Sequence, residues 1–173
     1  MTHRRLAATL TVLTLALALT AGCSKKKEPT AGAEEAPNFT LPSLTGGTVE
    51  LASHKGKVVL LDFWATWCPP CRAAIPHLVE LQQTFGPQGF QALGLNLDDN
   101  PDDLTGFLAR SPVNYPILRA DEKVRASYGG VSAIPQVFLV DRKGRIRERF
   151  QGYTPEIAEK MKASVQTLVQ EGS

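Results

Sequence analysis

Two cysteines, Cys68 and Cys71, enclose two prolines in the segment WATWCPPC, residues 64–71. A cysteine pair with this spacing can contribute two ligands to a metal ion. It can also open and close a disulfide and so transfer two electrons. The rest of the chain has to favour one of these two kinds of chemistry.

Metal binding by this pair lacks partners within the chain. A structural zinc site needs about four ligands, such as a second cysteine pair or paired histidines. Besides Cys68 and Cys71 the only cysteine is Cys23, and the histidines beyond the N-terminal segment are His54 and His77, which are isolated. A packed or surface histidine is the simpler interpretation of His77. We therefore expect no metal.

The elements around the cysteines favour thiol chemistry. Residues 57–65 are rich in β-branched and aromatic residues, as in a buried strand, and residues 69–85 have helical apolar spacing. Cys68 thus lies where a helix begins, and free N–H groups with the positive end of the helix dipole stabilise a thiolate there. Since a thiolate attacks disulfides, Cys68 is the predicted nucleophile, and Cys71, one turn further, is the predicted resolving thiol.

The remaining pattern predicts one α/β domain. A hairpin is expected around Gly46-Gly47, followed by alternating strands and helices, a second hairpin and a closing helix. The later predicted elements are a strand at 89–98, helices at 100–111 and 121–129, a hairpin at 136–150 and a helix at 154–170. This order implies a mixed central sheet with helices on both faces.

The N-terminus predicts export. Residues 1–22 have a positive start and an apolar run too short for a permanent membrane span, as in a secretory signal. The segment before Cys23 resembles the lipobox of bacterial lipoproteins, in which the cysteine carries lipid and becomes the first mature residue. An ordinary cleaved signal, with Cys23 as an incidental thiol, is the alternative. Lipid on Cys23 would leave the other two cysteines as one self-contained pair.

The segment after Cys23 predicts a tether. Residues 23–38 contain no large apolar side chain and are expected to be disordered, so the folded domain is expected at 39–173. The chain has 19 Lys and Arg against 17 Asp and Glu, and loss of Arg4 and Arg5 with the signal leaves 17 against 17. With no basic stripe and no nucleic-acid motif, we expect no nucleic-acid partner.

Two segments together resemble the signatures of the thioredoxin superfamily: VVLLDFWATWCPPCRAAIP and AIPQVFLVDRKGRI. Residues 96–120 between them resemble the strand–helix insert of TlpA-like and ResA-like membrane-anchored thiol–disulfide oxidoreductases. The resemblance covers about residues 37–170. It implies a thioredoxin-like fold, protein disulfides as substrates, and a membrane electron donor of the DsbD/CcdA type. It favours the reducing direction, with apocytochrome c or another exported thiol protein as a client. No cofactor is expected.

The resemblance also implies roles for residues around the cysteines. Pro135 is expected to be a cis-proline facing them, with Ile134 offering its backbone to an extended substrate segment. From the sequence alone, a proline that opens a strand explains Pro135 equally well. Trp67, Pro69 and Pro70 are expected to contact partner proteins.

Proton transfer is expected to differ from that of TlpA-like and ResA-like proteins. Those relatives carry a glutamate three positions after the second cysteine, where this chain has Ala74. Asp62 matches the buried aspartate of thioredoxin and would accept the proton of Cys71. A structural aspartate bonded to the backbone is the alternative. Thioredoxin has a lysine near its aspartate, and the corresponding residue here is Gly94, so no such partner is expected.

These observations predict an exported, membrane-anchored disulfide reductase that faces the periplasm or the cell exterior. A disulfide oxidase would use the same residues in the opposite direction. A thiol peroxidase of the same fold would need a cysteine in a PxxxTxxC-like setting, but Thr66 lies only two residues before Cys68. A non-catalytic metal-binding module would contain stoichiometric metal and resist thiol exchange.

Overall fold

Five strands form one mixed sheet in the order β5-β4-β3-β6-β7. The computed structural model describes residues 34–171. The strands are β3 (Val58–Trp64), β4 (Phe90–Asn96), β5 (Ile117–Arg119), β6 (Gln136–Val140) and β7 (Ile146–Gln151). The central strand β3 pairs in parallel with β4 and antiparallel with β6. β5 is parallel to β4, and β7 is antiparallel to β6.

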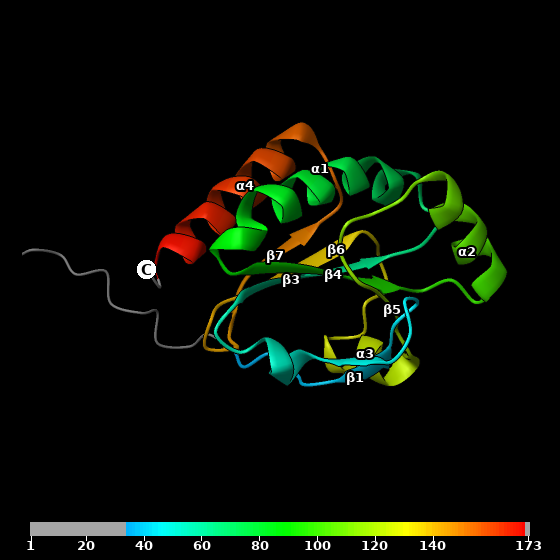
Figure 1. The fold of residues 1–173 in the computed structure, drawn as a ribbon, viewed down its shortest axis with the longest axis horizontal. Coiled ribbons are helices and arrows are strands. Elements are labelled where there is room, and N and C mark those ends of the chain that lie inside the picture. The colour runs from blue at the N-terminus through cyan, green and yellow to red at the C-terminus, as the bar shows by residue number, and fades with distance from the viewer. Residues whose placement is uncertain (1–33, 172–173) are drawn as a thin grey trace, which may run out of the picture. The chain divides into compact units, whose positions relative to one another are not determined.

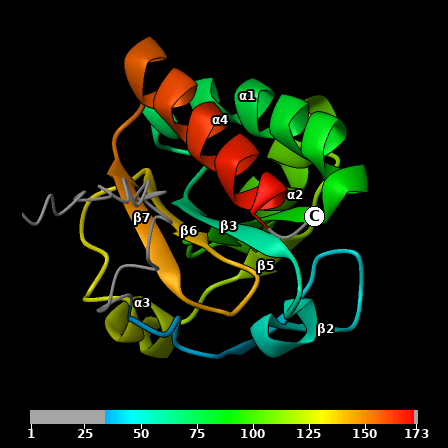
Figure 2. The same cartoon turned by 90° about the vertical axis from the view of Figure 1, so that its left-hand side faces the viewer.

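Helices cover both faces of this sheet. α1 (Pro69–Phe85) and α4 (Pro155–Gln170) lie side by side over one face (Figures 1 and 2). The short α3 (Glu122–Ser127) lies at the other face, together with the hairpin of β1 (Thr40–Pro42) and β2 (Thr48–Glu50). α2 (Pro101–Arg110) connects β4 to β5, and two short 3₁₀ helices are η1 (Leu51–His54) and η2 (Gly86–Gln88).

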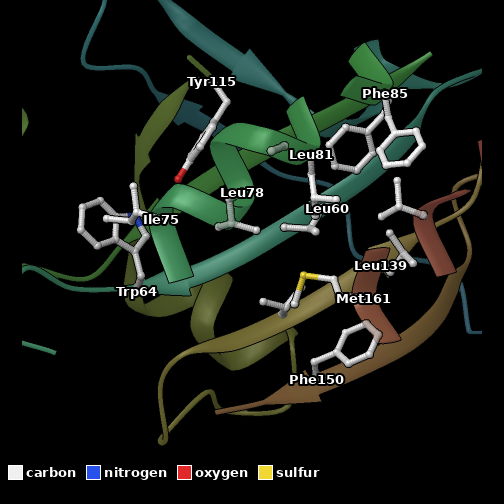
Figure 3. Close-up of a cluster of buried hydrophobic side chains, with 14 of the residues drawn as sticks. Leu60, Trp64, Ile75, Leu78, Leu81, Phe85, Tyr115, Leu139, Phe150 and Met161 are labelled. Carbon is white, nitrogen blue, oxygen red and sulfur yellow. The ribbon is translucent and has the colours of Figure 1, made fainter. Parts of the chain in front are cut away.

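A separate apolar core fills each side of the sheet. Because alternate residues of a strand point to opposite faces, β3 contributes to both cores, and all seven of its residues are buried. Figure 3 shows the core beneath α1 and α4, where Leu60 and Trp64 of β3 lie near Leu78 of α1. On the opposite face, the rings of Phe63 and Tyr128 lie 5.5 Å apart. The cysteine-bearing helix therefore rests on the most buried strand.

The predicted fold class is confirmed, and the predicted elements occur with ends that differ by a few residues. Residues 96–120 contain the last residue of β4, then α2 and β5. Their strand–helix arrangement widens the sheet on the β4 side, where β5 is the edge strand.

Residues 34–38, which the sequence places in a disordered tether, pack onto the domain. The N–H of Ala36 donates to the carbonyl of Gly144 at 2.9 Å, and the Tyr128 hydroxyl donates to the carbonyl of Pro37 at 2.8 Å. The Ala52 N–H also donates to Asn38 Oδ1, and the Asn38 amide donates to Glu50. Backbone atoms and polar side chains make these contacts, so the absence of large apolar residues did not reveal them.

The predicted signal, Cys23 and most of the predicted tether lie outside the described residues. Within residues 34–171, no helix is both long enough and apolar enough to cross a membrane.

Candidate active site

The start of α1 holds the sulfur of Cys68. Cys68 is the N-cap residue, with extended backbone, and its Sγ accepts a hydrogen bond from the Cys71 N–H at 3.3 Å. Pro69 and Pro70 occupy the first two helical positions and have no N–H, so Cys71 supplies the first backbone donor of the helix. A negative charge on the Cys68 sulfur would therefore meet one directed donor and the positive end of the helix dipole.

A disulfide joins the two cysteines, with an S–S distance of 2.05 Å and 5.3 Å between the Cα atoms. Cys71 is completely buried, whereas Cys68 keeps 4% of its surface exposed, and Pro69 and Pro70 beside it are exposed. A partner molecule can therefore approach the pair only from the side of Cys68. This asymmetry suits Cys68 as the attacking sulfur and Cys71 as the resolving one.

A second backbone segment lies against the Cys68 sulfur. The Ile134–Pro135 peptide bond is cis, and the Ile134 carbonyl oxygen lies 3.7 Å from Cys68 Sγ. Pro135 is buried, and its own carbonyl accepts a hydrogen bond from the Gly152 N–H at 2.8 Å. The half-buried backbone at Ile134 is thus fixed beside the site at which a mixed disulfide would form.

The two tryptophans of the motif have opposite environments. Trp64 is 1% exposed and packs on Phe107 of α2, with 5.6 Å between ring centroids. Trp67 is 65% exposed and lies one residue before Cys68. Within residues 34–171 the only other large apolar side chain classed as exposed is Leu44. Trp67 therefore presents an apolar surface directly beside the reactive sulfur.

Asp62 lies inside β3, on the face toward α1, because its neighbours in the alternation, Leu60 and Trp64, belong to the core beneath α1. It is 1% exposed, and its Oδ1 has no hydrogen-bond partner. Burial raises the pKa of Asp62 from 3.8 to about 7. A carboxyl with this pKa can accept and release a proton near neutral pH. Ala74, at the position of the relatives' glutamate, is buried in α1.

Asp98 is a site residue that the sequence interpretation missed. Its carboxylate accepts hydrogen bonds from the Thr66 hydroxyl at 2.9 Å and the Thr66 N–H at 3.1 Å. The Asn96 side-chain amide donates to the same carboxylate at 2.7 Å. Asp98 therefore ties the end of β4 to the loop that leads into Cys68. An acidic residue just after a buried strand, next to the cysteine strand, was the available signal.

The other candidate groups do not join the site. Among residues 34–171, no three His, Cys, Asp or Glu side chains lie together in a way that could hold a metal ion. His77 packs against Tyr153, with 6.4 Å between ring centroids, and His54 ends η1. The arrangement has what disulfide exchange needs: a sulfur at the start of a helix with a backbone donor, a second sulfur bonded to it, and a buried carboxyl on the face of β3 toward the helix that carries both sulfurs.

Comparison with protein families gives one match, in which residues 33–149 fit the AhpC/TSA family. The thiol-disulfide oxidoreductase ResA of Bacillus subtilis (strain 168) is 34% identical over 121 residues, covering 69% of this chain and 67% of that protein. ResA of Bacillus thuringiensis (strain Al Hakam) is 33% identical over 120 residues, covering 69% of both chains.

Among solved structures, the fold is similar to that of a candidate thiol:disulfide interchange protein DsbE from Chlorobium tepidum. The TM-score is 0.75 and the sequence identity is 34%, over 79% of this chain and 96% of the other.

The buried carboxyl of Asp62 should make stability depend on pH. Its raised pKa means that the folded protein binds this proton more tightly than the unfolded chain, so stability falls as pH rises from about 4 to about 7. Asp62→Asn should remove this loss, with a gain in unfolding free energy that grows to roughly 4 kcal/mol above pH 7. Urea unfolding of the disulfide-bonded parent and variant between pH 4 and 8 measures this gain in unfolding free energy. A gain that does not vary with pH would contradict the raised pKa.

Removing the carboxylate of Asp98 should loosen the loop before Cys68. Asp98→Ala leaves the Thr66 N–H and the Asn96 amide without their acceptor, at an expected loss of about 1–3 kcal/mol of unfolding free energy. Asp98→Asn keeps one acceptor oxygen and should lose less. Urea unfolding of the two variants checks this order. An alanine variant as stable as the parent would show that these hydrogen bonds contribute nothing.

Proposed function

This chain belongs to the AhpC/TSA family and is a ResA-like thiol–disulfide oxidoreductase of the thioredoxin superfamily, and we propose that it reduces disulfides of exported proteins. The observation that carries the proposal is the placement of the Cys68 sulfur. It accepts the Cys71 N–H where α1 begins, and it lies beside the Ile134 backbone. An extended partner segment bound at Ile134 would bring its own disulfide to this sulfur.

The reaction begins with both cysteines reduced. The Cys68 thiolate attacks one sulfur of the partner disulfide, the partner S–S bond breaks, and the other partner sulfur leaves as a thiolate. Cys71 then transfers its proton to the Asp62 carboxylate and attacks the Cys68 sulfur as a thiolate. The Cys68–Cys71 bond forms, and the second partner sulfur leaves. Two electrons pass from the cysteine pair to the partner. The two partner thiolates take up one proton that Asp62 gives back and one proton from water, and the partner is released as a dithiol.

Partner contacts are proposed for the exposed residues around Cys68. Trp67 supplies an exposed aromatic surface, and Pro69 and Pro70 supply a rigid exposed edge of α1. Ile134 supplies backbone groups. These contacts recognise an extended polypeptide by its shape rather than by a particular sequence, which suits an enzyme that acts on more than one protein disulfide.

The cellular setting is proposed from the N-terminal sequence and from the relatives. Lipid on Cys23 after removal of residues 1–22, followed by a tether, would hold the domain at a membrane outside the cytoplasm. Each turnover leaves Cys68 and Cys71 oxidised, so a reductant must return two electrons, and a membrane donor of the DsbD/CcdA type fits this need. Exported thiol proteins such as apocytochrome c are the proposed clients.

Replacing one cysteine at a time tests the assigned order of attack. In a Cys23→Ser background, Cys71→Ser should form a stable mixed disulfide through Cys68 with a small aromatic disulfide, releasing one thiolate per protein. The parent with both cysteines should release two thiolates and keep no adduct. Absorbance of the released thiolate and the mass of the protein measure both results.

Cys68→Ser is the matched control and should form the adduct far more slowly, because Cys71 is fully buried. A Cys68→Ser protein that forms the adduct through Cys71 as fast as Cys71→Ser forms it through Cys68 would contradict the assigned roles. Consumption of hydroperoxide without any reduction of insulin disulfides would instead support the peroxidase alternative.

A further inference from the structure

A glycine lies next to Asp62 in the sheet. Gly94 of β4 is the register partner of Asp62 on one side, and Ile117 of β5 is the partner of Gly94. A Cβ atom on Gly94 would lie 2.5 Å from Ile117 Cδ1, 3.0 Å from Trp64 Nε1 and 3.4 Å from Tyr115 Cε2. The space that a side chain of β4 would fill is therefore occupied by these three side chains.

Tyr115 reaches this space from the segment that precedes β5. It is buried in the core beneath α1, and Figure 3 shows its ring pointing inward, with the hydroxyl toward Ile75 and Trp64. Burial raises the pKa of Tyr115, and the charge of Asp62 raises it further. The hydroxyl therefore stays protonated at physiological pH. It is a hydrogen-bond donor in the same core as Asp62, and its pKa responds to the charge of that carboxyl.

The polar atoms around Gly94 are incompletely paired. Asp62 Oδ1 and Trp64 Nε1 are both buried without a hydrogen-bond partner. The other neighbours of Asp62 are apolar, such as its register partner Val137 on β6. Besides Asp62, the titratable side chains in the core between the sheet, α1 and α4 are Cys68, Cys71 and Tyr115. The charge of Asp62 raises the pKa of Tyr115.

An ionised carboxylate gains more from a hydrogen-bond donor than a neutral carboxyl does, because hydrogen bonds to charged groups are about twice as strong. A donor beside Asp62 therefore favours the form that can accept a proton from Cys71, whereas burial favours the protonated form. The two effects together would keep the carboxyl able both to take up and to release a proton.

In the disulfide-bonded structure Asp62 Oδ1 has no hydrogen-bond partner. We propose that Tyr115 is a positioning residue for proton transfer, and that in the reduced protein its hydroxyl donates to the ionised Asp62 carboxylate across Gly94 while Asp62 awaits the proton of Cys71. This inference rests on the proposed role of Asp62 as the proton acceptor. It also gives a reason for the glycine at this position: a Cβ atom on Gly94 would clash with Ile117 Cδ1 and crowd Trp64 Nε1, whereas Tyr115 would remain at ordinary contact distance.

Tyr115→Phe removes the hydroxyl and keeps the ring that packs over Gly94. The measurement is the rate at which Cys71 resolves a mixed disulfide on Cys68, followed by stopped flow between pH 5 and 9. Without the donor, the limb of the profile that depends on Asp62 should move to higher pH by about one unit. At pH values below that limb the rate should fall about tenfold, the effect of one charge-assisted hydrogen bond.

Tyr128→Phe is the matched control. Tyr128 is also a buried tyrosine, but it lies on the opposite face of the sheet and its hydroxyl donates to Pro37. Loss of the Tyr128 hydroxyl should leave the midpoint of the pH-dependent limb unchanged. Incorporation of 3-fluorotyrosine at position 115 retains the shape and strengthens the donor, so the midpoint should move to lower pH. This variant keeps the inference testable if Tyr115→Phe does not fold.

Asp62→Asn separates the two proposals. If it abolishes the pH-dependent limb, and Tyr115→Phe has no further effect in the Asp62→Asn protein, the inference is supported. If Asp62→Asn abolishes the limb but Tyr115→Phe leaves the midpoint in place, Tyr115 has no such role and Asp62 keeps its own. If Asp62→Asn leaves the profile unchanged, the proton-acceptor role fails. An equal effect of Tyr115→Phe with and without Asp62 would show that the tyrosine acts elsewhere.

Discussion

The function depends on one hydrogen bond, from the Cys71 N–H to the Cys68 sulfur at the start of α1. The two prolines between the cysteines cannot donate, so this single amide and the helix dipole together determine how well the sulfur carries a negative charge. The other features of the site act on this sulfur. The central strand delivers it, Asp98 fixes the loop that leads to it, and the Ile134 carbonyl faces it.

Two sulfurs of one pair need opposite environments, and the fold supplies both. Cys68 lies at the slightly exposed helix end, where a charge is favoured, whereas Cys71 is completely buried, where a charge is disfavoured. In the proposed reaction Cys71 therefore needs a proton acceptor inside the protein. Asp62, which we propose for this role, is buried in β3 between Leu60 and Trp64, whereas the buried residue 74 of α1 is an alanine.

The reactive residues could be predicted from the sequence, whereas most of the contacts that support them could not. The spacing of Cys68 and Cys71 after an apolar strand predicts them as the reactive pair, and the buried position of Asp62 follows from the same strand. The role of Asp98 could not be read from the sequence, because its partners at Thr66 and Asn96 meet it only when β3 and β4 pair. The packing of residues 34–38 also escaped prediction, since backbone atoms and polar side chains such as that of Asn38 make its contacts, and their partners lie far away in the sequence.

The most direct test of the account is the acidity of Cys68 in the reduced protein. Alkylation by iodoacetamide, followed by mass spectrometry between pH 4 and 10 in a Cys23→Ser background, gives the midpoint at which Cys68 becomes reactive. A thiolate stabilised at the start of α1 should give a midpoint at least one unit below the value of about 8.5 for a free cysteine. A midpoint at or above that value, equal to that of the unfolded chain, would contradict it.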